Sequence, residues 1–165
     1  MIQQNVNGSG FFSRSWAEFK VGFNDTGGNF WIGNDLLSQL TLTGRYKLKF
    51  DLQSRANPSN WYYAHYNTFR VSSEAYHYRL QVAGYSGNAG YNSFSYHNGM
   101  KFSTYDRDND RSSRNCAMSH GGGFWHNNCL YCGVNTMSGY TTRTGWYGLP
   151  GGSVLKSSRM WLQCK

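Results

Sequence analysis

Three aspartates at alternate positions mark the stretch of this sequence best suited to chemistry. Asp106, Asp108 and Asp110 stand in the run YDRDNDRSSRNC. Alternating acids in a polar loop can point their oxygens at one hard cation, and Ca²⁺ takes roughly 6–8 oxygen ligands from carboxylates and carbonyls. An EF-hand is excluded, because its Gly and Glu positions hold Arg111 and Ala117. A solvated turn whose Asp and Asn side chains bond their own backbone is the alternative that these residues leave open.

Catalytic motifs are missing from the sequence. No G-x-S-x-G, H-E-x-x-H or P-loop pattern occurs. Glycosidase chemistry needs a carboxyl group with a raised pKa in a shielded site, whereas the aspartate loop has the composition of an exposed turn. We therefore expect a binding protein and not an enzyme.

The cysteines favour an oxidising environment. Four cysteines allow three disulfide pairings. They are Cys116, Cys129, Cys132 and Cys164. A zinc site is disfavoured because no pair of C-x-x-C motifs is present. Since disulfides persist outside the cytosol, we expect a secreted, extracellular protein.

Composition and charge exclude several other classes. The 165 residues are enough for one domain with a core. Only 15% of them are charged and 18% are aromatic, so aromatic side chains must supply much of the buried area. The net charge is +8, but Lys and Arg are scattered without a basic block, which argues against specific nucleic-acid binding. No run of about 18 apolar residues exists, so no membrane span is expected.

Hydrophobic spacing predicts two helices in the first quarter of the chain. Trp16, Phe19 and Phe23 share one face of a helix over residues 13–23, with Ser13 or Ser15 as its cap. Residues 24–28, with two glycines, should end it. Residues 34–35 are expected to cap a second, short helix that runs to about residue 40.

Period-two alternation predicts the strands. Residues 46–52 place Tyr, Leu, Phe and Leu opposite Lys, Lys and Asp, as in a half-buried strand. Residues 61–72 and 76–82 follow as two more strands joined by a short turn at 72–75. Trp161 and Leu162 should bring a last strand back into the sheet. The prediction is an α+β fold, with a twisted, mainly antiparallel sheet flanked by short helices and a loop-rich remainder after residue 84.

Longer motifs in the sequence resemble those of a known family. GYSGNAGYNSFSYHNGMKFSTYDRDNDRSSRNCA resembles the core signature of the fibrinogen-related domain, the C-terminal globular module of fibrinogen, ficolins and tachylectins. FFSRSWAEFKVGFNDTGGNFWIGNDLLSQLT resembles the family's opening, and YKLKFDL and VLKSSRMWL resemble later strands. The resemblance implies one domain over 1–165, with a sheet subdomain of 1–84 plus 154–164 and a calcium and ligand subdomain of 85–153. The family's N-terminal segment with its disulfide is expected to be absent, because the match begins at its V-I-Q-R-R strand.

The resemblance also implies a metal site and one disulfide. Calcium is expected on the side chains of Asp108 and Asp110 and on the backbone carbonyls of Ser112 and Arg114, with Asp106 outside the shell. Cys116 and Cys129 correspond to a family disulfide. Cys132 and Cys164 have no family counterpart, and we hypothesise a second disulfide between them.

A ligand pocket beside the second cysteine is implied in the same way. In the lectin members a cis peptide, here Asn128-Cys129, turns the N–H groups of the cysteine and its successor toward an acetyl carbonyl. The residue after that cysteine is Leu130 where the lectins have His. The remaining matched positions are His120, Tyr140 and Thr141. By composition alone, His120 and His126 are interpreted as loop or stacking residues, and Phe124-Trp125 as core packing.

Two functions follow as expectations. The first is a calcium-stabilised lectin for acetylated or acidic glycans, serving innate immune recognition through oligomers and avidity. The alternative is a protein-binding module that receives a peptide or receptor, favoured by Leu130 and a shortened 130–139 loop. Two N-x-S/T sequons, at Asn7 and Asn24, leave glycosylation open.

Overall fold

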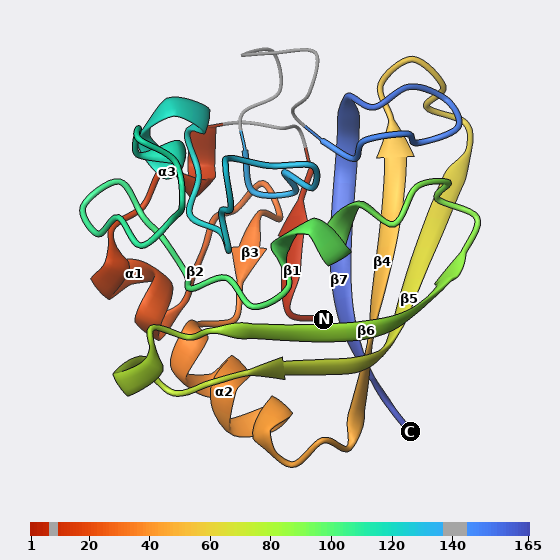
Figure 1. Ribbon diagram of the computed structural model, residues 1–165. Helices are drawn as coiled ribbons and strands as arrows, with labels where there is room; N and C mark the ends of the chain where they lie inside the picture. Colours follow the sequence, from red (N-terminus) through yellow and green to blue (C-terminus); the bar gives the residue numbers. More distant parts are fainter. Residues whose placement is uncertain (7–9, 137–144) are drawn as a thin grey trace.

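An antiparallel sheet forms the centre of the molecule (Figure 1). The computed structural model describes residues 1–6, 10–136 and 145–165, so Asn7, Tyr140 and Thr141 lie outside the described residues. The strands are β1 (Gln3–Asn5), β2 (Phe23–Asn24), β3 (Phe30–Trp31), β4 (Tyr46–Ser54), β5 (Trp61–Val71), β6 (Leu80–Gly87) and β7 (Leu155–Cys164). Their order across the sheet is β2-β3-β1-β7-β4-β5-β6, and neighbouring strands run antiparallel.

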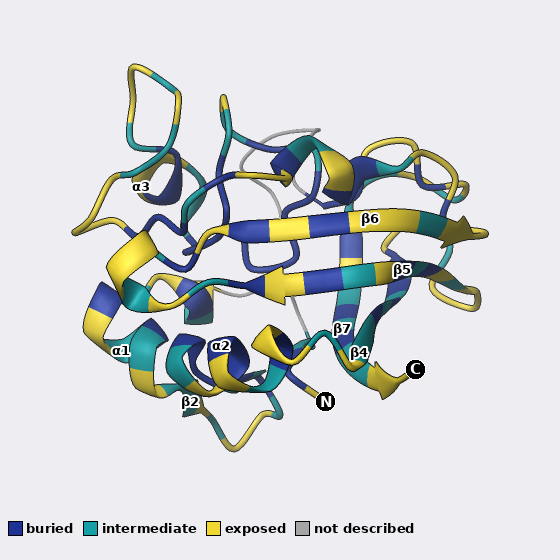
Figure 2. Ribbon diagram, turned by 60° about the horizontal axis from the view of Figure 1, so that its bottom comes forward, coloured by how far each residue is buried: buried dark blue, intermediate teal, exposed yellow. Residues whose placement is uncertain are grey.

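Short helices surround this sheet, as the α+β prediction requires. They are the 3₁₀ turns η1 (Gly10–Phe12), η2 (Glu74–Tyr76) and η3 (Ser93–His97), and the α-helices α1 (Trp16–Val21), α2 (Asn34–Leu42) and α3 (Cys116–His120). In both ribbon views α2 and α3 lie on opposite sides of the β5–β6 pair (Figures 1 and 2). No helix among the described residues has both the length and the apolar character needed to cross a bilayer.

Helix α1 begins after Ser15, one of its two predicted caps, and ends earlier than predicted. Ser15 is its N-cap and forms a capping box with Glu18. The helix stops at Val21 because Gly22 adopts φ 95°, where a Cβ would lie 2.8 Å from the Ile32 carbonyl. Phe23 therefore belongs to β2 and not to the helix.

Helix α2 also has a different start from the one expected. Gly33, at φ 100°, is its N-cap, and Asn34 is already helical. The Asn34 side chain is used by the core instead, since its Oδ1 accepts a hydrogen bond from Trp31 Nε1 at 3.1 Å.

The predicted strands are confirmed, with one shift. Strand β4 buries Leu48, Phe50 and Leu52 and leaves the intervening residues half-buried, as the alternation indicated. The third predicted strand, 76–82, starts later, at Leu80. The reason is a wider turn, in which η2 is followed by His77 and Tyr78 at φ 56° and 50°.

Aromatic rings fill the core, as the composition predicted. Fully buried rings gather between the sheet and the long loop region, and Figure 2 shows buried bands alternating with exposed ones along strands β5 and β6. Phe124 and Trp125 are both 0% exposed, which confirms their interpretation as packing residues. Trp125 Nε1 donates to the Tyr78 carbonyl at 2.7 Å, so its polar edge is also satisfied.

The last strand returns to the middle of the sheet. Strand β7 pairs with β1 on one side and with β4 on the other, with Trp161 opposite Lys49. Between β6 and β7 the described chain forms loops, η3, α3 and isolated bridges. The candidate site residues stand on these loops, which the buried aromatic rings hold against the sheet. The division into two subdomains stays a prediction.

Candidate functional site

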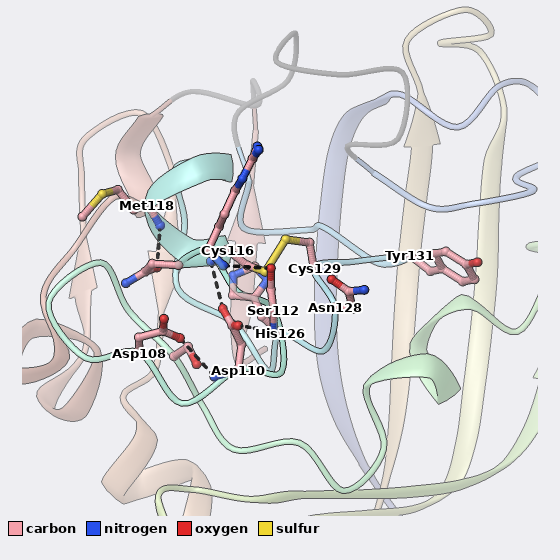
Figure 3. Close-up of a disulfide and its surroundings, with 12 residues drawn as sticks. Asp108, Asp110, Ser112, Cys116, Met118, His126, Asn128, Cys129 and Tyr131 are labelled. Carbon is pink, nitrogen blue, oxygen red and sulfur yellow. Dashed lines mark hydrogen bonds between the residues drawn. A yellow bond between two sulfur atoms is a disulfide. The ribbon is translucent and has the colours of Figure 1, made fainter.

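The aspartate loop is held in shape by its own side chains (Figure 3). Asp108 Oδ1 accepts a hydrogen bond from the backbone N–H of Asp110 at 3.1 Å. The two oxygens of Asp110 accept from the N–H groups of Ser112 and Cys116, both at 2.8 Å. Each carboxylate thus keeps lone pairs free while the backbone is fixed around it.

Asp106 has a different role from its two neighbours. Its Oδ1 accepts from the N–H of Trp16 at 2.9 Å and from Thr104 Oγ1 at 2.7 Å. Trp16 is the first residue of α1, where a carboxylate is favoured by the free N–H groups of the helix. Asp106 therefore fastens α1 to the loop, and its place outside a metal shell stays a prediction.

The donor set of the loop fits a hard cation. Asp108 and Asp110 supply carboxylate oxygens, and the carbonyls of Ser112 and Arg114 accept no hydrogen bond from any other described residue. Burial, with the Asp108 charge as a further cause, raises the pKa of Asp110 above its ordinary value. Within the described chain no three His, Cys, Asp or Glu side chains gather at one point. A metal here would depend on carbonyl and water oxygens, which calcium accepts.

The disulfide predicted from the resemblance is confirmed. Cys116 and Cys129 are bonded, with Cα atoms 5.1 Å apart. Cys116 is the first residue of α3, whose N-cap Asn115 accepts from the N–H of Met118 at 2.9 Å. The bond therefore ties the aspartate loop and α3 to the segment around Cys129.

The hypothesis of a second disulfide is wrong. Cys132 and Cys164 are both free thiols. The Cys132 side chain is fully buried, and burial raises the pKa of its thiol. Cys164 is exposed at the end of β7, opposite Tyr46. One sulfur lies in the interior and the other faces solvent, so the two cannot bond without rearrangement.

The expected cis peptide is also wrong. No peptide bond is cis among the described residues, and the Asn128-Cys129 bond is trans. The chain turns instead at Cys129, whose φ is 55°. Neither the N–H of Cys129 nor that of Leu130 donates to an acceptor in the described part of the chain. The turn thus leaves two neighbouring donors without a described partner, which is the feature the pocket needs.

The predicted side chains around this turn differ in accessibility. Asn128 is exposed, but Leu130 is only 5% exposed, so Leu130 offers a ligand its main chain and not its side chain. His120 ends α3 and is half-buried, and burial lowers the pKa of its imidazole. The structure brings Asn128, Cys129 and Leu130 together; Tyr140 and Thr141 lie outside the described residues.

A buried histidine fixes the loop after the disulfide. His97 Nε2 accepts from the N–H of Cys132 at 3.0 Å and of Tyr131 at 3.3 Å, so its Nδ1–H donates to the Trp125 carbonyl at 2.8 Å. Burial lowers the pKa of His97 to about 3. The sequence did not reveal this role, since one histidine within YHNG carries no sign of its partners 28 to 35 positions away.

Tyrosines form a surface beside the N–H groups of Cys129 and Leu130. Tyr131 stacks on Tyr96 at 4.3 Å between ring centroids and on Tyr147 at 5.0 Å, with interplanar angles of 17° and 23°. Tyr91 meets Tyr147 edge-on at 5.3 Å. Tyr91 and Tyr147 are 53% and 47% exposed. We call these four residues the tyrosine surface.

The tyrosine surface is rigid and next to Asn128. Tyr96 Oη donates to the Asn128 carbonyl at 3.3 Å. The N–H of Tyr147 donates to the Tyr131 carbonyl at 2.9 Å, and Ser93 Oγ donates to the Tyr147 carbonyl at 2.7 Å. Figure 3 shows Asn128 between the disulfide and Tyr131. This surface was not predicted from the sequence, although the many tyrosines after residue 84 were a signal.

Comparisons with known proteins agree with this architecture. The family model for the C-terminal globular domain of fibrinogen beta and gamma chains matches residues 1–161. Tenascin from Mus musculus is 45% identical over 134 residues, which are 81% of this chain and 6% of tenascin. The chain thus spans a small part of that relative.

Two solved structures share the fold. The fibrinogen-like globe domain of human ANGPTL2 is similar with a TM-score of 0.87 at 34% identity, over 99% of this chain and 78% of that one. Lamprey fibrin D-dimer, complexed with the peptide Gly-His-Arg-Pro-amide, has a TM-score of 0.83 at 30% identity, over 98% of this chain and 59% of that one.

Proposed function

Since this chain belongs to the fibrinogen C-terminal globular domain family, we propose that it is an extracellular recognition module that binds a segment of another protein. The binding site is the tyrosine surface together with the turn at Cys129. The observation that carries this proposal is the row of stacked rings, Tyr96, Tyr131 and Tyr147, beside the N–H groups of Cys129 and Leu130, for which the described residues provide no acceptor.

The chemistry of this site suits a peptide chain. Stacked tyrosines offer a large, preorganised apolar area at little entropic cost, and tyrosine is enriched among the residues that dominate interfaces. Two adjacent N–H donors match a main-chain carbonyl of a partner. The lamprey fibrin structure contains a peptide ligand, which supports a peptide as partner for a domain of this fold.

Leu130 also favours a protein partner. Its side chain is buried, so this position offers a ligand only its main chain and supplies no imidazole of the kind that the lectin resemblance implies. Such a module acts by binding and not by catalysis.

A displayed peptide library tests the proposal. Peptides selected on the wild-type protein should bind Tyr147→Ser and Tyr131→Ser at least about tenfold more weakly, since losing a central aromatic anchor typically costs about 2 kcal/mol or more. Tyr105→Ser is the matched control, because Tyr105 is 41% exposed and lies outside the tyrosine surface. Peptides that bind all three variants as tightly as the wild type would refute the site.

A lectin for acetylated sugars is the second candidate. The free N–H groups of Cys129 and Leu130 favour it, because one acetyl carbonyl can accept from them and the nearby rings can receive its methyl group. Retention on N-acetylglucosamine resin, with elution by N-acetylglucosamine but not by glucosamine, would support this function. No retention would leave the peptide function.

We further propose that calcium binds the aspartate loop as a structural ion. Asp108 and Asp110, with the carbonyls of Ser112 and Arg114, would hold it, and its charge would balance two neighbouring carboxylates. Tenascins are extracellular, and the Cys116–Cys129 disulfide needs an oxidising compartment, so secretion is part of the same proposal. Self-association would raise the avidity of such a site.

A further inference from the structure

A groove lined by cations lies on another part of the surface. Three pockets of about 460, 440 and 150 Å³ all contain Arg79 in their walls. The first two also share Ser72, and the first and third share Lys101. The three pockets therefore adjoin one another around Arg79, and we call them together the basic groove. It follows the exposed turn between β5 and β6, seen at one end of that pair in Figure 2.

The basic groove carries positive charge without a matching acid. Arg70, Arg79, Lys101 and Arg111 line it. None of the eight Asp and Glu residues, all of which the structure describes, lines any of the three pockets. Among the described residues none of the four cations has a carboxylate within 4.0 Å. Their charges therefore face solvent and remain available to an anion.

The nearest acid on the same turn is already neutralised. Glu74 accepts from Lys20 Nζ and from Trp16 Nε1, and Arg107 lies 3.9 Å away. The hydrogen bonds from Lys20 and Trp16 lower the pKa of Glu74, and Glu74 lines none of the three pockets. At the other end Arg111 follows Asp110 in the aspartate loop, and a cation bound in that loop would offset the charge of its carboxylates.

Neutral polar groups stand between the cations. Gln81 and Asn98 line the groove with amide side chains. Asn98 Oδ1 accepts from the N–H of Val82 at 2.8 Å, which leaves its amide N–H groups as donors to a ligand. The Arg70 guanidinium lies over Gly44, where a Cβ would come within 2.6 Å of it. A small residue thus makes room for one of the cations.

We propose that the basic groove binds a sulfated polysaccharide. Sulfate is a tetrahedral oxyanion that Arg and Lys can bond, with Arg offering a planar fork of donors. Sugar hydroxyls match the amides of Gln81 and Asn98, and Tyr76, which is 69% exposed in the groove wall, can pack against a sugar ring. Such polymers are found outside cells, which is where the proposed function puts this disulfide-bonded chain.

Nucleic acid fits the same surface less well. Single strands need a series of aromatic platforms for successive bases, and the groove has Tyr76 and His77 as its rings. Reading a duplex requires an element that enters a groove of the DNA, and the short turn η2 is not such an element.

Heparin affinity at several salt concentrations is the test. The double variant Arg79→Gln/Lys101→Gln should bind heparin about tenfold or more weakly, the effect of losing one or two charge-assisted hydrogen bonds. The logarithm of affinity should fall linearly with the logarithm of salt, with a shallower slope in the variant. Arg45→Gln/Lys156→Gln removes the same charge at exposed positions outside the groove and should bind as the wild type does.

Three outcomes would overturn the proposal. Equal losses of heparin affinity in the two double variants would show that net charge alone, and not the groove, determines binding. Unchanged binding by Arg79→Gln/Lys101→Gln, or by Arg111→Gln if the first variant does not fold, would refute the groove. If duplex DNA of equal charge or anionic vesicles bound as tightly as heparin, the claim that the groove binds a sulfated polysaccharide would be refuted. Because the tyrosine surface is untouched, these variants should still bind the selected peptides, which separates this proposal from the proposed function.

Discussion

Asp110 Oδ2 accepts a hydrogen bond from the backbone N–H of Cys116 at 2.8 Å, so a carboxylate of the aspartate loop directly contacts a residue of the disulfide. Its other oxygen holds the N–H of Ser112. Asp110 therefore joins three features: the loop that would bind calcium, the start of α3, and the bond that holds the Cys129 turn. Changes in any one of them should be measurable in the others.

Replacing Asp110 should separate calcium binding from folding. Asp110→Asn keeps one carbonyl acceptor but places an amide against the second N–H, so we expect a loss of about 1–2 kcal/mol in unfolding free energy. It should also abolish the stabilisation that calcium gives the wild type, about 2.7 kcal/mol at 100 times the dissociation constant. Thermal unfolding with and without calcium measures both effects.

Asp106→Asn is the matched control for that experiment. Asp106 bonds Trp16 and Thr104, so this variant should lose stability but keep the calcium response. A calcium response retained in Asp110→Asn, or lost in Asp106→Asn, would show that the ion is not bound as proposed.

Removing the disulfide should destabilise the domain and weaken calcium binding together. The bond closes a loop with a sequence separation of 13, for which chain entropy gives about 3 kcal/mol. Cys116→Ser/Cys129→Ser should lower the unfolding free energy by about that amount and loosen the N–H that Asp110 accepts. Urea unfolding and calcium titration test this, with Cys164→Ser as the control, since Cys164 is exposed and free. An unchanged calcium affinity in the double variant would contradict the coupling.

The buried His97 should make the domain sensitive to acid. The unfolded chain binds a proton on this imidazole below its ordinary pKa of 6.5, while the folded chain keeps it neutral down to about 3. The unfolded state thus binds more protons in this window, so stability is complete above pH 6.5 and falls as the pH is lowered. The slope approaches about 1.4 kcal/mol per pH unit for one such histidine.

Denaturant unfolding between pH 7 and 5 measures this slope, above the range in which most carboxylates titrate. His126, whose pKa burial lowers to about 4, adds to it with the same sign. His97→Gln should be less stable at pH 7 but show a shallower slope, by roughly 1.4 kcal/mol per pH unit. An identical slope in the variant would mean that His97 is not neutral in the fold.

The glycine triplet should tolerate no side chain at its centre. A Cβ on Gly122 would lie 1.9 Å from the Asn135 carbonyl oxygen, a backbone atom that cannot move independently. We expect Gly122→Ala to cost about 3 kcal/mol or more in unfolding free energy. Gly27→Ala, in an exposed turn where the nearest atom is Asp25 Oδ1 at 3.3 Å, should change stability by less than about 0.5 kcal/mol. Similar values for the two variants would contradict the close approach.

Local patterns predicted the regular elements because they act over a few residues. The alternation of β4 and the Ser15 cap of α1 depend on neighbours in sequence, and both were found where expected. The late start of β6 was not predictable, since the left-handed conformations of His77 and Tyr78 leave no mark in composition.

The candidate site was predictable only in part, because its contacts link distant residues. The family resemblance predicted the Cys116–Cys129 disulfide and singled out the aspartate loop. The pairing of Cys132 failed because nothing in the sequence shows that its sulfur faces the core. The stack of Tyr96, Tyr131 and Tyr147 joins residues 16 to 51 positions apart and needs the folded chain to appear.

The alkylation rate of the buried Cys132 thiol can measure how often the loop around it opens. Its thiol is enclosed one residue from Tyr131, while its N–H is bonded to His97. An alkylating reagent should therefore modify Cys164 at once and Cys132 only when this loop opens. With Cys164 replaced by Ser, the rate of alkylation reports how often the loop that carries Tyr131 and Cys132 opens locally. A partner that occupies that surface will slow the reaction, so its binding can be timed without attaching any label.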